Sequence, residues 1–282
     1  MATNFFSYMG GKHYLAKTIV KLMPTHKRYI EPFVGSGKIL FTKEPSEIEV
    51  INDADKKIAN LFYCVAFYFD EFWDKAKWLL HSREMLTVFR RKMQTSEPTQ
   101  FGDVEHAVIT YYVLVSSFSG KVGGSLRYAI EESEAKKFIT NKILNLRAIR
   151  KRLKNVIIEC KDFEDIINTW DKPDTFFYCD PPYFGTEHYY AVSFTKTDHE
   201  RLLTLLKQTK GKWILSGYHN ELYDTVLKGY PYTEKQLSKF SFGVTKSSKS
   251  KSKPPATEVL WFNFEPDKEM LKELKLELRY AD

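Results

Sequence analysis

Asp180, Pro181, Pro182 and Tyr183 are the residues of this chain with the clearest chemical potential, and they directly follow an apolar run over 175–179. Proline cannot donate to a β-ladder and its ring fixes φ, so the two prolines stiffen the chain just past a buried strand. Open α/β sheets bind ligands at the carboxyl ends of their strands. A carboxylate and an aromatic ring held there suit a flat nitrogen heterocycle with an exocyclic amine. A proline-rich turn with an Asp cap is the alternative interpretation.

A second candidate site begins at Tyr29, where a short strand leads into a tight Gly35-x-Gly37 turn and a helix is expected from Lys38. Glycines in such a turn adopt positive φ and let the backbone approach a ligand closely. The third glycine of the dinucleotide fingerprint is absent because Leu40 takes its place, and the Gly-Lys-Ser/Thr ending of a phosphate loop is absent too. The turn therefore disfavours a pyrophosphate ligand.

Two acids follow further predicted strands. Asp53 ends the strand over 47–52 and lies 16 residues beyond Gly37, close to the separation at which an acid reaches ribose hydroxyls in nucleoside-binding α/β folds. Asp162, followed by Phe163, comes after the strand over 155–160. Each acid is also a good N-cap, Asp53 for a helix starting near Ala54 and Asp162 for a helix over 164–167. The two roles are compatible.

The elements that must position these residues alternate between strand and helix. An amphipathic helix is predicted over 14–23, and further strands over 176–179, 212–216 and 258–262. This alternation predicts an α/β fold with a mainly parallel, doubly wound sheet. From 55 to about 145 the apolar spacing is helical, with a Gly- and Ser-rich loop or hairpin over 116–128. We therefore predict a catalytic domain over 1–55 and 146–282 and an inserted domain over 56–145.

Three motifs in this order resemble those of a known family. The segments 33–37 and 180–183 resemble the two signatures of S-adenosylmethionine-dependent DNA amino-methyltransferases, and residues 8–12 resemble the aromatic-x-Gly-Gly-Lys opening of their Dam-type (alpha group) adenine-N6 members. The resemblance extends to about Phe262. It implies a mixed, seven-stranded Rossmann-like sheet whose final hairpin inserts an antiparallel strand. It also implies that the insertion is a mainly helical target-recognition domain.

The resemblance implies roles for the matching residues. Asp53 would bind the ribose hydroxyls of S-adenosylmethionine, and Asp162 would accept from the exocyclic amine of its adenine. Tyr8 and Lys12 would lie over the methionine end. The full set of expected cofactor contacts is Tyr8, Gly10, Lys12, Glu31, Phe33, Gly35, Gly37, Asp53, Asp162, Phe163 and Asp180.

The catalytic residues would be Asp180, Pro181, Pro182 and Tyr183. Adenine N6 is a weak nucleophile because its lone pair is delocalised into the ring. If the Asp180 carboxylate and the Pro181 carbonyl each accept one N–H, the nitrogen is drawn towards tetrahedral geometry and its developing positive charge is stabilised. The base must leave the duplex to reach them, and Tyr183 would offer a stacking face. No cysteine beside a proline is present for attack on a cytosine ring.

A net charge of +7 and a pI near 9.0 suit an anionic polymer as partner, and the resemblance implies that this polymer is duplex DNA. Lys121, Ser125, Arg127 and Tyr128 in the Gly-rich loop suit groove contacts. Lys246, Lys249 and Lys251, in the lysine-rich segment 246–255, suit phosphate contacts without base reading. A solvated loop is the alternative for that segment. The basic cluster over 147–152 fits a solvated helix end equally well, and we assign it no contact.

The cysteines and the apolar stretches indicate where in the cell the protein is expected. Cys64, Cys160 and Cys179 lack metal-ligand spacing, which predicts reduced thiols, no metal, and a cytoplasmic protein of a prokaryote or of a viral host. No signal peptide opens the chain, and the weakly charged stretch 107–119 is too short to cross a bilayer. A monomer or weak dimer suffices for the chemistry.

Three alternative functions share this pattern. Methylation of cytosine N4 uses the same geometry, although Asp rather than Ser before the prolines favours adenine by resemblance. Methylation of RNA or of a protein glutamine is disfavoured by the basic insertion. A catalytically silent DNA-binding module of the same fold is disfavoured by the intact motifs.

Overall fold

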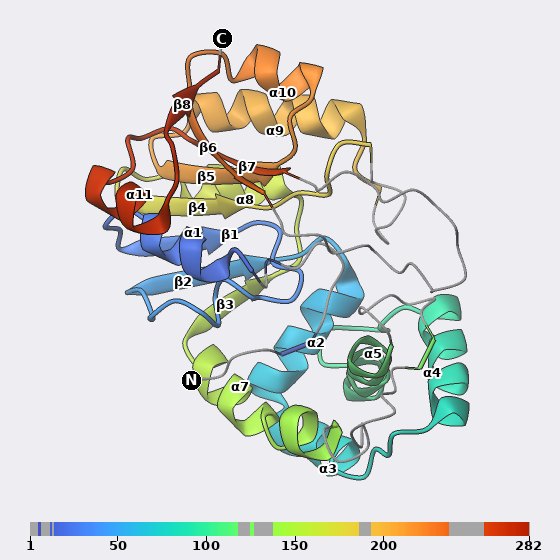
Figure 1. The fold of residues 1–282 in the computed structure, drawn as a ribbon. Coiled ribbons are helices and arrows are strands. Elements are labelled where there is room, and N and C mark those ends of the chain that lie inside the picture. The colour runs from blue at the N-terminus through green and yellow to red at the C-terminus, as the bar shows by residue number, and fades with distance from the viewer. Residues whose placement is uncertain are drawn as a thin grey trace, which may run out of the picture.

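The strands of the computed structural model form a single mixed sheet (Figure 1). The structure describes residues 5–6, 12, 14–117, 125–126, 138–185, 193–236 and 257–281. The strand order is β3-β2-β1-β4-β5-β7-β6-β8. The strands are β1 (Arg28–Glu31), β2 (Ile48–Asn52), β3 (Val156–Glu159), β4 (Thr175–Cys179), β5 (Lys212–Gly217), β6 (Pro231–Gln236), β7 (Thr257–Phe262) and β8 (Arg279–Tyr280). The predicted α/β class with a mixed sheet is confirmed.

The first five strands run parallel, and β7 lies antiparallel between β5 and β6. The described part of the chain contains eight strands where the resemblance implied seven. The additional strand is the two-residue β8, which pairs with β6 at the edge of the sheet. Neither β6 nor β8 was among the strands predicted by residue range, because the polar composition of both gives little apolar signal.

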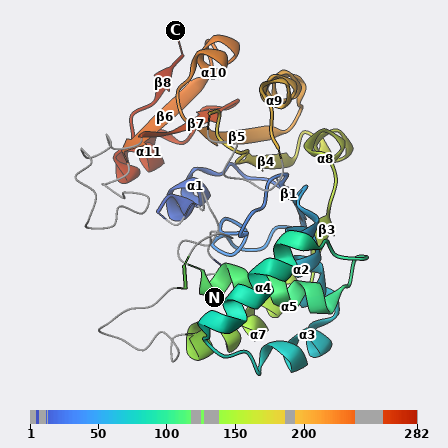
Figure 2. The same ribbon diagram turned by 90° about the vertical axis from the view of Figure 1, so that its right-hand side faces the viewer.

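Helices cover both faces of the sheet. They are α1 (Ala16–Leu22), α2 (Lys56–Phe67), α3 (Phe69–Ala76), α4 (Arg83–Thr95), α5 (Val104–Ser116), the π-helix η2 (Phe138–Ile143), α7 (Leu146–Leu153), α8 (Phe163–Trp170), α9 (Lys196–Gln208), α10 (Glu221–Val226) and α11 (Lys268–Leu274). Figure 2 shows α1 and α11 on one side of the sheet and α8 and α9 on the other. Successive strand residues point to opposite faces. Accordingly, Phe176 and Tyr178 of β4 join one apolar cluster, and Phe177 and Cys179 join the second.

The segment between β2 and β3 is mainly helical, as predicted. Its central helix is α5, and α2, α3 and α4 pack around it. Every residue of α5 except Glu105 is buried, and Asp103 caps the helix by accepting from His106 N at 2.9 Å. A helix that is apolar on all sides belongs in a core. Among the residues that the structure describes, no helix is long and apolar enough to cross a membrane.

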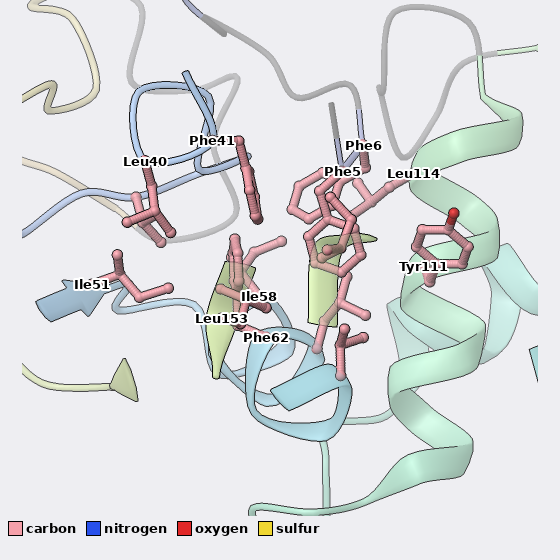
Figure 3. Packing of buried hydrophobic residues seen from close by; sticks show 14 of the residues in the cluster. Phe5, Phe6, Leu40, Phe41, Ile51, Ile58, Phe62, Tyr111, Leu114 and Leu153 are labelled. Atoms are coloured by element: carbon pink, nitrogen blue, oxygen red, sulfur yellow. The ribbon is translucent and has the colours of Figure 1, made fainter. Parts of the chain in front are cut away.

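Aromatic residues join this helical layer to the sheet. Figure 3 shows Phe5 and Phe6 lying between the turn that carries Phe41 and the helix that carries Tyr111. Phe5 stacks on Tyr111 with ring centroids 5.7 Å apart, and it meets Phe62 of α2 edge-on at 5.3 Å. The apolar core is therefore continuous from the sheet into the helices of the segment 56–145.

The predicted helix from Lys38 is a single turn. Phe41 N donates to Gly37 O at 2.9 Å and Lys43 N to Ile39 O at 3.0 Å, and no α-helix is assigned over these described residues. Pro45 follows closely, and a proline cannot donate to a continuing helix. The prediction of a helix here was wrong.

In the basic cluster on α7, Arg152 packs against the protein, whereas Arg147, Arg150 and Lys151 are exposed. Arg152 donates from Nη2 to Glu49 Oε1 at 2.7 Å and to Leu40 O at 3.0 Å. The guanidinium of Arg147 lies 4.7 Å from the ring of Trp73, and that of Arg150 lies 5.3 Å from the ring of Phe69. These arginines attach α7 to the sheet and to α3.

Glu49→Ala should cost about 3–5 kcal/mol of stability. The Glu49 carboxylate is buried and also accepts from Lys43 Nζ at 2.6 Å, so its removal leaves two cations without their acceptor. Urea unfolding measures this loss. Asp74→Ala, which breaks the exposed pair with Lys77, is the control and should change stability by less than about 1 kcal/mol. Equal losses in the two variants would contradict the prediction.

Candidate active site

The carboxyl ends of β1, β2 and β3 are joined by the buried side chain of Asn52. Its amide nitrogen donates to Pro32 O at 2.9 Å and to Lys161 O at 3.0 Å, and its oxygen accepts from Lys161 N at 2.8 Å. Three chain segments that leave the sheet are thereby held at fixed separations. The loops that follow these strands form one rim of the sheet, where parallel strands place ligands.

The glycine turn has the predicted conformation. Gly35 and Gly37 adopt φ of 48° and 66°, the left-handed region that glycine enters without steric cost. Gly35 N donates to Asp53 Oδ2 at 3.0 Å, so the acid that ends β2 fixes the turn that follows β1. The interpretation of Asp53 as a helix N-cap was wrong. Asp55 caps α2 by accepting from Lys57 N, and Asp53 Oδ1 accepts from Asp55 N.

A single pocket brings together most of the predicted cofactor residues. Those among its lining are Lys12, Glu31, Phe33, Gly35, Asp53, Asp162, Phe163 and Asp180, and the predicted catalytic residue Pro182 lines it too. Gly37 instead lies behind the turn, next to the rings of Phe41 and Phe62. Phe33, Phe163 and Phe194 form an aromatic triangle at the pocket, with each pair of ring centroids 5.6 Å apart. The pocket thus combines a turn with close backbone access, carboxylates and a group of aromatic rings.

Asp162 is the N-cap of α8, as one of its two interpretations predicted. Its Oδ1 accepts from Glu164 N at 2.9 Å and from Arg201 Nη2 at 3.0 Å. Arg201 also bonds Asp198 and covers the ring of Phe163 at 4.9 Å. The carboxylate therefore stands at the pocket in a fixed orientation, and its contact with a cofactor adenine stays a prediction.

Asp180, at the end of β4, is held in a buried network of charges. Lys12 Nζ lies 2.6 Å from Asp180 Oδ1 and 3.2 Å from Glu258 Oε1. It also lies 4.6 Å from the centroid of the Tyr183 ring, and the Tyr183 hydroxyl donates to Glu258. Lys12 is only 6 % exposed, so its ammonium group lies within the buried network.

Burial raises the pKa of Asp180 to about 6, although Lys12 opposes the shift and Glu258 adds to it. Burial also raises the pKa of Glu31 to about 8, with a further contribution from Asp180. Glu31 accepts a hydrogen bond from Tyr29 OH at 2.7 Å. Asp180 is therefore ionised near neutral pH next to a carboxyl group that is largely protonated. The rim carries less negative charge than its acids would suggest.

The charge of Asp53 should make stability depend on pH. Burial, together with Asp55, raises the pKa of Asp53 to about 7. A carboxyl group whose pKa is raised by folding stabilises the protein below its unfolded pKa, and that contribution is lost as the pH rises through the folded pKa. The unfolded pKa of an Asp is about 4, and the folded pKa of Asp53 is about 7. As the pH rises from the first value to the second, the melting temperature of the wild type should therefore fall relative to that of Asp53→Asn. Each kcal/mol corresponds to roughly 2–4 °C. Parallel curves for the two proteins would contradict the assignment.

The remaining predicted residues are less informative. Tyr8, Gly10, Lys121, Arg127, Tyr128, Lys246, Lys249 and Lys251 lie outside the described residues. Ser125 is exposed beside Leu126, which bridges Ser117 in antiparallel fashion, in line with the hairpin predicted there. Pro181 is buried between Asp180 and the pocket residue Pro182. In the described part of the chain, no cluster of His, Cys, Asp or Glu is arranged to hold a metal ion.

Comparison with known proteins identifies the family. The sequence profile of the D12 class N6 adenine-specific DNA methyltransferases matches residues 8–239. The chain belongs to this family. The resemblance noted in the three motifs is confirmed, and the enzyme is a site-specific DNA methyltransferase that modifies adenine N6.

Relatives of this methyltransferase include proteins of bacteria and of a virus. It is 25 % identical to the Type II methyltransferase M1.LlaDCHI of Lactococcus lactis subsp. cremoris, over 92 % of this chain and 95 % of the relative. It is 28 % identical to the Type II methyltransferase M.CviBI of Paramecium bursaria Chlorella virus NC1A, over 80 % and 87 %. The retron Ec67 DNA adenine methylase of Escherichia coli is 23 % identical, over 94 % and 95 %.

Two residues of the methyltransferase site were missed from the sequence. Glu258 contacts both Lys12 and Tyr183, and Phe194 completes the aromatic triangle. A signal for Glu258 was present, because a charged residue opens an otherwise apolar strand, and such a residue needs a partner when buried. Phe194 lies in a loop before α9, where composition carries no comparable signal.

Proposed function

We propose that this methyltransferase uses S-adenosylmethionine, bound in the pocket at the strand ends, to methylate an adenine flipped out of duplex DNA. The observation that carries the proposal is the position of the Asp180 carboxylate, which lines the same pocket as the Gly35 turn and Asp53. A methyl donor bound along that rim would have its reactive end near Asp180. Two relatives are named Type II methyltransferases, which favours a role in restriction-modification.

The residues of the pocket fit the proposed cofactor. Asp53 presents a carboxylate beside the turn, suited to accept from ribose hydroxyls. Phe33 and Phe163 offer apolar faces for adenine, with the Asp162 carboxylate at their edge to accept from its amine. Lys12 at the Asp180 end suits an anionic methionine carboxylate, as does Tyr8 by resemblance. When bound, S-adenosylmethionine supplies a methyl group activated by a sulfonium.

The chain's own residues then activate the target adenine. The Asp180 carboxylate accepts one N6 hydrogen and the Pro181 carbonyl accepts the other, which directs the nitrogen lone pair towards the pocket. Both acceptors stabilise the positive charge that develops on N6. Lys12 Nζ lies on Asp180 Oδ1, and Glu258 is a second carboxylate within its reach. Tyr183 provides the stacking face for the flipped base, an interaction worth roughly 1–3 kcal/mol.

DNA recognition is assigned to the inserted segment 56–145 and to the lysine-rich segment. Lys121, Ser125, Arg127 and Tyr128 would contact the groove. A monomer or weak dimer in the cytoplasm is sufficient, because one chain carries all of these parts.

Replacing Lys246, Lys249 and Lys251 with Gln should weaken DNA binding uniformly across sequences. The slope of log K against log salt is negative, and each lost phosphate contact should reduce its magnitude by about 0.9. Fluorescence anisotropy at several salt concentrations measures both effects. Gln at Lys228, Lys268 and Lys272, all exposed, removes the same charge elsewhere and should have little effect. A change in the DNA sequence that is methylated would instead show that the segment reads bases.

The proposal is tested by methyl transfer from labelled S-adenosylmethionine to unmethylated duplex DNA, followed by nucleoside analysis. N6-methyladenine is the expected product, and sequencing of the modified sites gives the specificity. N4-methylcytosine would overturn the assignment of the base. Cofactor binding without label in DNA would redirect the search to RNA or protein acceptors.

A further inference from the structure

Glu258 is a buried carboxylate that the chemistry proposed above mentions only as a second partner of Lys12. Its side chain is 4 % exposed. Oε1 accepts from the Tyr183 hydroxyl and lies 3.2 Å from Lys12 Nζ. Tyr183 and Lys12 are the two residues that flank Asp180 in the network. Glu258 therefore contacts both neighbours of the proposed catalytic carboxylate.

Packing alone does not explain an acid at this position. The residues that follow it in β7, Val259 to Phe262, are apolar and buried. An apolar residue would fill the position without the cost of burying a carboxylate, which is large unless the group is paired. β7 lies between β5 and β6 with hydrogen bonds to both, so Glu258 is attached to a rigid part of the sheet. A rigid anchor suits a residue that orients others.

We propose that Glu258 is the positioning residue of the target-adenine pocket. By accepting from the hydroxyl, it fixes the rotation of the Tyr183 ring on which the adenine stacks. By attracting Lys12, it provides an alternative partner for the cation when Asp180 receives the adenine N6. Glu258 acts through these two residues, since it lies outside the residues that line the cofactor pocket. The inference rests on the function proposed above for Asp180 and Tyr183.

The proposal is tested by measuring the rate of single-turnover methylation at saturating cofactor. The proteins compared are the wild type, the single variants Glu258→Ala, Glu258→Gln and Tyr183→Phe, and the double variant that combines Tyr183→Phe with Glu258→Ala. Glu258→Ala should lower the rate by about 30-fold, and Glu258→Gln by less, because an amide oxygen still accepts from Tyr183. In the Tyr183→Phe background, Glu258→Ala should cost only a few-fold, because the hydroxyl is already absent. Cofactor affinity should change by less than about threefold.

Two readouts separate positioning from a loss of stability. With 2-aminopurine in place of the target adenine and no cofactor, Glu258→Ala should reduce the fluorescence increase on DNA binding. In Glu258→Gln, Asp180 loses one negative neighbour and keeps Lys12, Glu31 and the Tyr183 hydroxyl around it, so its pKa should fall. The acidic limb of the plot of kcat/KM against pH should therefore move to lower pH. Glu49→Gln, which alters an equally buried carboxylate away from the pocket, should be less stable yet keep the wild-type fluorescence and profile.

The inference is overturned if Glu258→Ala methylates at the wild-type rate. It is also overturned if the loss is equally large in the Tyr183→Phe background, or if Glu49→Gln reproduces the changes in fluorescence and pH profile. Failure of the proposed function is a different result, because the wild type itself would then produce no N6-methyladenine.

Discussion

Asp180→Ala is expected to reduce methyl transfer by roughly 10³-fold or more, while cofactor and DNA affinities stay close to those of the wild type. Removing one preorganised electrostatic contact to a developing charge commonly costs about 10²–10³ in rate. Asp180 would contribute both such a contact and the orientation of N6. The fold should survive the change, because Lys12 keeps Glu258 as a buried partner.

The experiment combines single-turnover kinetics with calorimetric titration of the cofactor. Asp180→Asn should keep an oxygen that can accept an N6 hydrogen but lose rate, since its amide group carries no negative charge to stabilise the positive charge that develops on N6. Glu49→Gln is the control for the loss of a buried carboxylate and should retain the wild-type rate. A parallel loss of cofactor binding and activity in Asp180→Ala would reject the catalytic assignment in favour of a structural role.

Gly37→Ala should have the second largest effect, on both stability and cofactor affinity. An added Cβ would lie 2.9 Å from Phe41 Cε2 and 3.2 Å from Phe62 Cζ, at a residue with φ of 66°. Both rings belong to the packed cluster that joins the sheet to α2, so neither can move freely. Overpacking of a core costs about 1–3 kcal/mol, and the strained φ adds to it. The displaced turn should weaken cofactor binding by about 100-fold, or ~2.7 kcal/mol.

Gly229→Ala is the matched control for this substitution. Gly229 has φ of 83°, and an added Cβ there meets no atom within 4 Å. Gly229→Ala therefore introduces the same kind of backbone strain as Gly37→Ala but no steric contact. Gly229 is also not among the residues that line the pocket. Thermal unfolding and cofactor titration of both variants separate the two causes. Equal cofactor affinities in the two variants would show that the shape of the turn does not depend on Gly37.

Much of the site could be predicted because its residues follow local patterns. A strand, a turn with two glycines and an acid after the next strand are all encoded within short segments. Parallel strands end at the same edge of a sheet, so Gly35, Asp53 and Asp180 had to lie on one rim once the strands were recognised. The same locality explains the capping role of Asp162, which depends on residues next to it in sequence.

Errors arose where a residue's environment comes from distant segments. The packed position of Arg152 was not predicted, because its partner Glu49 lies on β2, 103 residues away in sequence. Asp53 looks like a helix cap until the turn after β1 presents Gly35 N to it. One error had a local cause instead: the helix expected after Gly37 is a single turn, and Pro45, which cannot donate to a continuing helix, follows it closely.

The sequence by itself determined the fold class, the rim that carries the site and the chemistry of the acid and prolines on it, because these depend on hydrophobic periodicity and on short motifs. The tertiary structure alone decided which side chains meet. Lys12 reaches Asp180 from the N-terminal segment, and Glu258 reaches Tyr183 because β7 is inserted between β5 and β6. Strand order and register fix such contacts, and neither is encoded in any local stretch of residues.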